Sequence, residues 1–226
     1  MKIGILQCGA IPEELAAAHG PYGEMMRRLL PSGHQVVVQD VTTGMLPGSP
    51  TECDAWMLTG SAAGVYDDLP WIAPLKTFLA EARGRAKLVG ICFGHQIMAE
   101  AFGGRVVKSP KGWGIGLHRY EVREQATWME DAAPVCVPAS HQDQVVEAPP
   151  GARVTIASDF TPYAGFDYGN AISFQCHPEF TPGFCVALLQ SRRALYGAGT
   201  ESAMESLAAP NDSPRMATWI SRFLES

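Results

Sequence analysis

The segment 90–96 (GICFGHQ) holds the residue best placed for nucleophilic chemistry. An apolar run ends at Cys92, and apolar residues at helical spacing follow it, so a strand should turn sharply into a helix there. Such an elbow exposes its hinge residue and directs the first backbone N–H groups of the helix at the reacting atom. Glycines at 90 and 94 let neighbouring chain pack close to the elbow. The pattern predicts that Cys92 is a nucleophilic thiolate, and the alternative is a small buried residue.

A nucleophile of this kind needs a base and a group that orients the base. His177 ends an apolar run, and Glu179 follows two positions later, with Pro178 fixing the geometry between them. In an extended chain this spacing puts both side chains on one side, so Glu179 can bond one ring nitrogen while the other faces Cys92. The alternative is a surface histidine beside a solvated glutamate. Because the P-C-x-x-C that accompanies H-x-E in zinc deaminases is absent, we expect no metal.

Acyl chemistry also needs donors for an oxyanion, and backbone N–H groups near the elbow could supply them. The N–H of Phe93 directly follows the nucleophile, and the glycine-containing loop 60–64 follows the strand-like run AWMLT. Gly60 is the expected second donor. The loop matches neither G-x-x-x-x-G-K-[ST] nor G-x-G-x-x-G, and the chain has no G-x-S-x-G serine elbow. We expect no cofactor.

Composition narrows the class of protein further. The chain has 226 residues, a formal net charge of −6 and 18% charged residues, which argues against a nucleic-acid partner. No run approaches 18 apolar residues, so we expect no membrane span. The cysteines form no C-x-x-C and indicate a reducing, cytoplasmic location, with Cys176 expected to pack at a strand end. They are Cys8, Cys53, Cys92, Cys136, Cys176 and Cys185.

The elements that must position these residues follow from apolar runs and breaks. A helical segment from Pro12 to Leu30 should break near Gly20–Pro21, and a second helix is expected over 70–83. Alternation of strands and helices is typical of an α/β sheet with crossovers. The strands expected in this half are 2–8, 35–39, 55–59 and 87–92.

From about Trp113 onward the pattern changes to short extended runs without helices between them, which predicts an antiparallel section. A helix over 184–196, a mobile linker over 197–214 and a short amphipathic helix over 215–224 should follow. The extended runs are 117–122, 135–138, 144–147, 154–158, 163–166 and 171–176.

Four segments, in this order, resemble the class I glutamine amidotransferases over roughly residues 1–195. They are the loop 58–68 (LTGSAAGVYDD), the elbow 90–96, the segment 140–145 (SHQDQV) and the segment 174–180 (FQCHPEF). The chain is most similar to stand-alone members that look like the glutaminase part of GMP synthase, a group that also resembles plant γ-glutamyl peptidases. The resemblance implies a flavodoxin-like α/β fold, with a mixed, mostly parallel central sheet flanked by helices and an antiparallel section in the second half. It also implies one domain over 1–197, with 198–226 packed on it as linker and helix.

The same resemblance assigns roles to residues. It implies a triad of Cys92, His177 and Glu179, and an oxyanion hole from the backbone of Gly60 and Phe93. It places a second set of side chains around the α-amino and α-carboxylate groups of a γ-glutamyl substrate: Gln96, Ser140, His141 and Gln142. A rival triad of Cys92 with His141 and Asp143 is the alternative.

The implied activity is cleavage of the γ-glutamyl amide bond of glutamine or another γ-glutamyl compound through a cysteine thioester. No S-G-G-x-D-S pyrophosphatase loop occurs in the 226 residues, so we expect that this chain does not make GMP by itself. Two alternatives remain: a glutaminase that delivers ammonia to a separate synthetase partner, and a non-catalytic binding protein on the same fold.

Overall fold

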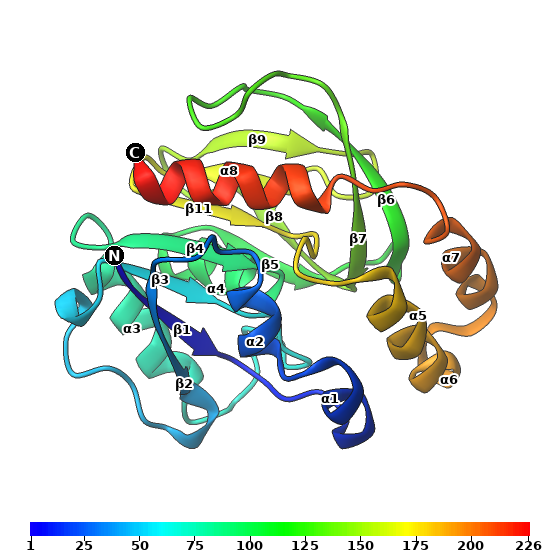
Figure 1. The fold of residues 1–226 in the computed structure, drawn as a ribbon, viewed down its shortest axis with the longest axis horizontal. Helices are drawn as coiled ribbons and strands as arrows, with labels where there is room; N and C mark the ends of the chain where they lie inside the picture. Colours follow the sequence, from blue (N-terminus) through cyan, green and yellow to red (C-terminus); the bar gives the residue numbers. More distant parts are fainter.

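A nine-stranded sheet runs through the molecule in the order β2-β1-β3-β4-β11-β10-β9-β6-β7 (Figure 1). The computed structural model describes residues 1–226. The first five strands in this order are parallel. They are β2 (Gln35–Asp40), β1 (Lys2–Gln7), β3 (Ala55–Leu58), β4 (Lys87–Ile91) and β11 (Ala171–Phe174). This half has the flavodoxin-like order, with a later strand completing the parallel set.

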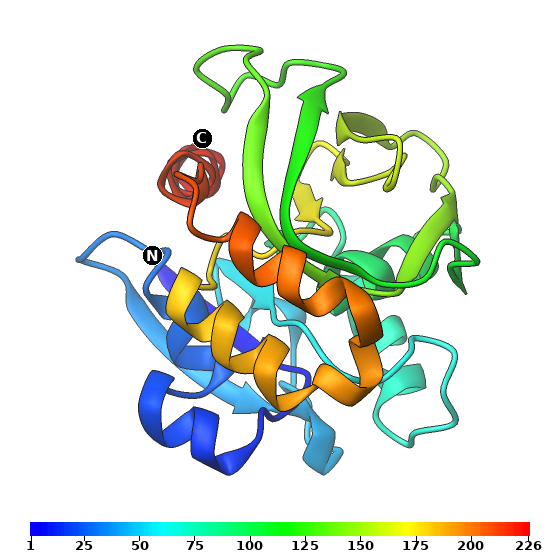
Figure 2. The same cartoon turned by 90° about the vertical axis from the view of Figure 1, so that its right-hand side faces the viewer.

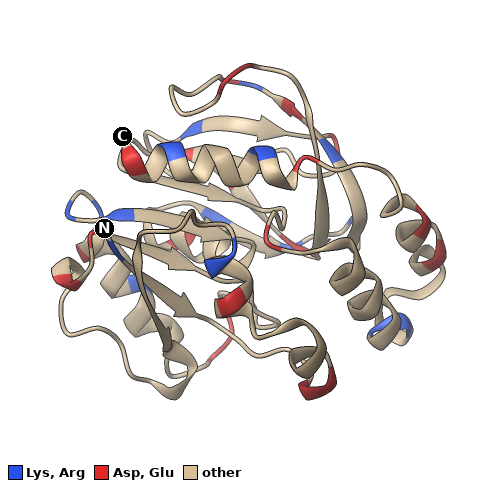
Figure 3. Ribbon diagram, in the orientation of Figure 1, with Lys and Arg blue, Asp and Glu red and all other residues tan.

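The other half of the sheet is antiparallel, as the change of pattern after Trp113 predicts. Its strands are β10 (Gly165–Asp167), β9 (Arg153–Ala157), β6 (Gly114–Val122) and β7 (Val135–His141). A separate two-stranded ribbon joins β5 (Arg105–Lys108), which the sequence did not suggest, to β8 (Asp143–Glu147). Lys, Arg, Asp and Glu are scattered over the molecule, whereas β3, β7 and β11 carry none of them (Figure 3).

Helices cover both faces of the parallel strands because those strands are apolar on both sides. In β3, Met57 contributes to one core and Trp56 and Leu58 contribute to the other. The helices are α1 (Glu13–His19), α2 (Tyr22–Arg27), α3 (Ile72–Ala82), α4 (Phe93–Ala101), α5 (Pro182–Ser191), α6 (Arg193–Tyr196), α7 (Thr200–Ser206) and α8 (Ser213–Glu225). Single 3-10 turns lie at Val41–Thr43, Pro50–Glu52 and Gly197–Gly199. None of the helices has the length and apolar character needed to cross a bilayer.

The break at Gly20–Pro21 is confirmed, since α1 ends at His19 and α2 begins at Tyr22. The prediction of a mobile linker over 197–214 is wrong, because α7 lies within it and packs on β6 beside α5 (Figure 2). A Cβ on Gly116 of β6 would lie 2.9 Å from the Cα of Ala203 in α7. The small residues that suggested a linker instead allow close packing.

Helix α8 closes one face of the sheet. Met216, Trp219, Ile220 and Phe223 recur at helical spacing and share a core with Ile3 of β1. The indole Nε1 of Trp219 donates a hydrogen bond of 2.6 Å to Oε2 of Glu130. The C-terminal segment therefore holds part of the central core in place.

Replacing Trp219 tests how strongly this helix is held. Trp219 is fully buried, so we expect Trp219→Ala to lower the free energy of unfolding by about 3–5 kcal/mol in urea titration. Thr218→Ala, on the exposed face of the same helix, is the matched control and should change stability by less than about 1 kcal/mol. Equal effects of the two substitutions would contradict the packing described.

Candidate active site

Three neighbouring strands carry the predicted reacting groups at their carboxyl ends. Gly60 follows β3, Cys92 follows β4 and His177 follows β11, and these strands lie in the order β3-β4-β11. Because the strands are parallel, their carboxyl ends meet at one edge of the sheet. The register pairs Ile91 with Phe174, which brings the segments that follow into contact.

The elbow at Cys92 has the sharp geometry that the sequence predicts. Its φ of 53° and ψ of −101° make it the only residue other than glycine with a positive φ. A Cβ on Gly90 would lie 2.5 Å from the carbonyl oxygen of Gly94, and one on Gly94 would lie 2.7 Å from the carbonyl oxygen of Leu58. Both glycines are therefore needed for the close approach of β3, β4 and α4.

His177 and Glu179 form a buried pair behind the elbow. His177 Nδ1 and Glu179 Oε1 are 2.7 Å apart, with side chains 4% and 1% exposed. The imidazole and the Cys92 side chain line the same small recess beside Gly60. Phe180 stacks on this ring at 3.9 Å between centroids and 8° between planes. The structure thus brings together the three residues expected to form a triad.

The charge state of His177 depends on its neighbours. Burial acts to lower the pKa of His177, but the Glu179 carboxylate and the Cys92 sulfur raise it from 6.5 to about 10. His177 is therefore an imidazolium at neutral pH.

The expected oxyanion donors have unoccupied N–H groups. Neither Gly60 N nor Phe93 N donates to a protein acceptor. A Cβ on Gly60 would lie 3.1 Å from Cε1 of His177 and 3.7 Å from Cβ of Cys92, so a side chain at this position would crowd both of these residues. Phe93 is the first residue of α4, where backbone donors are free by helix geometry.

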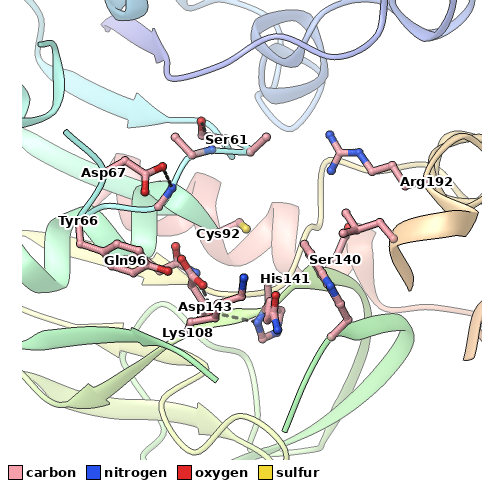
Figure 4. Close-up of a pocket in the computed structure, with 16 residues that line it drawn as sticks. Ser61, Tyr66, Asp67, Cys92, Gln96, Lys108, Ser140, His141, Asp143 and Arg192 are labelled. Carbon is pink, nitrogen blue, oxygen red and sulfur yellow. Dashed lines mark hydrogen bonds between the residues drawn. The ribbon is translucent and has the colours of Figure 1, made fainter. Parts of the chain in front are cut away.

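A pocket of about 540 Å³ opens over Cys92 (Figure 4). It includes the four side chains expected to contact a substrate, together with groups of both charges. The lining residues are Ser61, Ala62, Ala63, Gly64, Tyr66, Asp67, Cys92, Gln96, Lys108, Trp113, Ser140, His141, Gln142, Asp143, Arg192 and Leu195.

Two of the expected substrate-binding side chains are held by protein contacts. Gln96 Nε2 donates to the backbone oxygen of Asp143 at 2.9 Å and to Oε1 of Gln175 at 3.1 Å, which leaves Gln96 Oε1 without a protein partner. Ser140 Oγ lies 3.1 Å from the hydroxyl of Tyr196. Gln142 lines the pocket beside them.

His141 does not form the rival triad. Its Nδ1 lies 3.2 Å from the backbone oxygen of Asp143 rather than from the carboxylate, and its Nε2 lies 3.5 Å from Oγ1 of Thr161. Burial lowers the pKa of His141 to about 3, so the ring is neutral. His141 therefore contributes to the pocket wall.

Sequence reasoning missed Lys108 and Arg192, which belong to no motif. Lys108 ends β5, a strand that was not predicted, and Arg192 lies between α5 and α6 inside a segment read only as helix. Their positions follow from the tertiary fold alone.

Comparisons with known proteins agree with this geometry. The glutamine amidotransferase class-I family model matches residues 24–185. The chain is 27% identical over 242 residues to a glutamine amidotransferase-like protein of Schizosaccharomyces pombe, covering 98% of each. It is 30% identical over 135 residues to gamma-glutamyl peptidase 4 of Arabidopsis thaliana, which covers 56% of this chain and 54% of the peptidase. The fold matches the crystal structure of a glutamine amidotransferase from Thermotoga maritima with a TM-score of 0.75, at 20% identity and 99% coverage of both chains.

This chain therefore belongs to the class I glutamine amidotransferase family. The predicted family and the predicted α/β fold are both confirmed. Members of the family include enzymes that act on glutamine or γ-glutamyl compounds, as their names state.

The pairing of His177 with Glu179 predicts a pH-dependent stability. The pKa of His177 is raised in the folded state. The stabilisation that the protonated imidazole gives the folded protein is therefore fully present below pH 6.5 and is lost as the pH rises through about 10. The deficit in unfolding free energy of Glu179→Gln, measured in urea, should be largest near pH 6 and shrink toward pH 10.

The matched control for this titration is Glu147→Gln. Glu147 pairs with Arg105 at the exposed surface, so its substitution should give a small difference at every pH. A deficit of Glu179→Gln that grows as the pH rises would contradict the assignment.

Proposed function

We propose that this protein is a cysteine hydrolase that cleaves the γ-glutamyl amide bond of glutamine or of another γ-glutamyl compound. The observation that carries the proposal is the Cys92 elbow, with its positive φ, which shares a recess with a buried imidazole that is itself bonded to Glu179. Membership of the family and the similarity to a γ-glutamyl peptidase support the same reaction.

The first half-reaction forms a thioester. The Cys92 thiolate, whose proton has passed to His177, attacks the γ-carbonyl carbon, and the N–H groups of Gly60 and Phe93 hold the oxyanion. When the tetrahedral intermediate collapses, the C–N bond breaks and His177 gives its proton to the leaving nitrogen. Glu179 keeps the imidazole oriented and stabilises its charge throughout.

The second half-reaction restores the enzyme. His177, now neutral, accepts a proton from water, and the resulting hydroxide attacks the thioester carbon. The C–S bond then breaks, glutamate leaves and the Cys92 thiolate is regenerated beside the imidazolium. No cofactor or metal takes part in these steps.

The pocket suits the charged end of a glutamyl group. Asp143 and Lys108 offer opposite charges for an α-ammonium and an α-carboxylate, and Gln96 Oε1 is free to accept a hydrogen bond. We assign Ser140, His141 and Gln142 to the wall that fixes the orientation of this group.

Neither proposed oxyanion donor is blocked by a protein acceptor, so the site supports turnover without a partner that completes it. This observation favours a hydrolase over a subunit that depends on a separate synthetase. The grouping of Cys92 and His177 at one recess, with Glu179 bonded to His177, favours an enzyme over a binding protein.

Substitution of the nucleophile tests the proposal. We expect Cys92→Ser to lower glutamate release from glutamine and γ-glutamyl compounds by roughly three orders of magnitude or more, because a serine in this site lacks an activated thiolate. Cys136→Ser, at a partly exposed thiol outside the site, is the control and should retain activity. Wild-type rates in Cys92→Ser would exclude the proposed mechanism.

A further inference from the structure

Arg192 is a cation beside the nucleophile without a protein partner. It lies at the junction between α5 and α6, is partly buried and forms no ion pair and no side-chain hydrogen bond. The adjacent Arg193 is exposed, pairs with Glu201 and is not among the residues that line the pocket. In Figure 4 the guanidinium of Arg192 extends toward the space near Cys92, from the side of the pocket opposite Tyr66 and Asp67. An unpaired guanidinium in such a place is suited to an anionic ligand.

Arg192 stands on the side of Cys92 that faces His177. Arg192 and His177 line a small recess beside the main pocket, together with Cys92, Tyr22 and Ser140. Tyr22 stacks on Phe180, which stacks on the imidazole of His177. Burial raises the pKa of Tyr22 and the charge of Arg192 opposes this shift, whereas burial raises the pKa of Asp143 and a hydrogen bond with Tyr66 and the charge of Lys108 oppose it. The two free cations thus serve different halves of the site.

The reaction itself distinguishes those halves. His177 must reach the leaving nitrogen to protonate it, so the amine portion of the substrate lies on the His177 side and the glutamyl portion lies toward Gln96 and Asp143. Arg192 is therefore placed to contact the amine portion. Ammonia, the product from glutamine, would leave this guanidinium without a partner. Trp113 and Leu195, which also line the pocket, offer apolar surface for a side chain on the amine portion.

We infer that Arg192 binds a carboxylate on the leaving amine, and that the preferred substrates are γ-glutamyl amino acids or peptides rather than glutamine. This inference rests on the proposed γ-glutamyl hydrolase function. Guanidinium and carboxylate match in a bidentate geometry that a neutral amide cannot reproduce. Hydrolysis of such a substrate breaks the γ-glutamyl C–N bond, adds water and releases glutamate and a free amino acid or peptide.

The test uses a pair of substrates that differ in one charge, γ-glutamylglycine and γ-glutamylglycinamide. Glutamate release gives kcat/KM for each, and the ratio of the two values measures recognition of the carboxylate. A charge-assisted contact predicts a wild-type ratio of about 10 to 100 in favour of γ-glutamylglycine. Arg192→Gln should bring this ratio close to 1, and Arg192→Lys should keep part of it.

Arg193→Gln is the matched control, since it alters the neighbouring arginine outside the site and should keep the wild-type ratio. Thermal unfolding of each variant checks that the fold is retained. A ratio that Arg192→Gln leaves unchanged would overturn the inference, and so would an equal loss on both substrates, which would assign Arg192 to the glutamyl portion. If wild-type protein releases glutamate from neither substrate nor from glutamine, the proposed function itself fails.

Discussion

The backbone of Cys92 adopts a conformation that residues with a side chain rarely occupy, and the surrounding chain is built to maintain it. The amide of Cys92 donates to the carbonyl of Phe174 at 2.8 Å, and its own carbonyl accepts from Gln96 at 3.0 Å. The absence of side chains at Gly90 and Gly94 lets three elements approach the elbow closely. A strained backbone conformation persists only where surrounding contacts hold it in place, and such residues cluster at functional sites. Here the strained residue lines the pocket and directly precedes α4, whose first amides are free by helix geometry.

The order of the strands then brings the partners to the elbow. With β3 on one side of β4 and β11 on the other, Gly60 and His177 flank Cys92 without any long loop to position them. The His177–Glu179 pair is almost fully buried, which strengthens its electrostatic interaction and makes an unpaired charge costly. Phe180, stacked flat on the imidazole, limits the ring to a narrow set of orientations. Geometry and electrostatics therefore favour the same arrangement of the reacting groups.

Much of this site could be predicted from the sequence because its parts are local. The elbow needs a strand, a cysteine, glycines and a helix in succession, and the pairing of His177 with Glu179 needs only two-residue spacing. Residues that act through tertiary contacts were harder to find. Arg192 has no local signature, and the apolar segment of β2 does not reveal that it is an edge strand with Val37 and Val38 exposed. Helix α7 was missed because Ala, Ser and Gly are typical both of linkers and of closely packed helices.

The most direct test of the central claim is to identify the thiol that reacts with a substrate-like electrophile. The protein would be incubated with a diazo-ketone analogue of glutamine, digested and examined by peptide mass spectrometry. The structure predicts one modification for each chain, on Cys92, with the other five cysteines unmodified and competition by γ-glutamyl substrates. Unmodified Cys92 in folded protein, or modification spread equally over several cysteines, would contradict the assignment of Cys92 as the nucleophile.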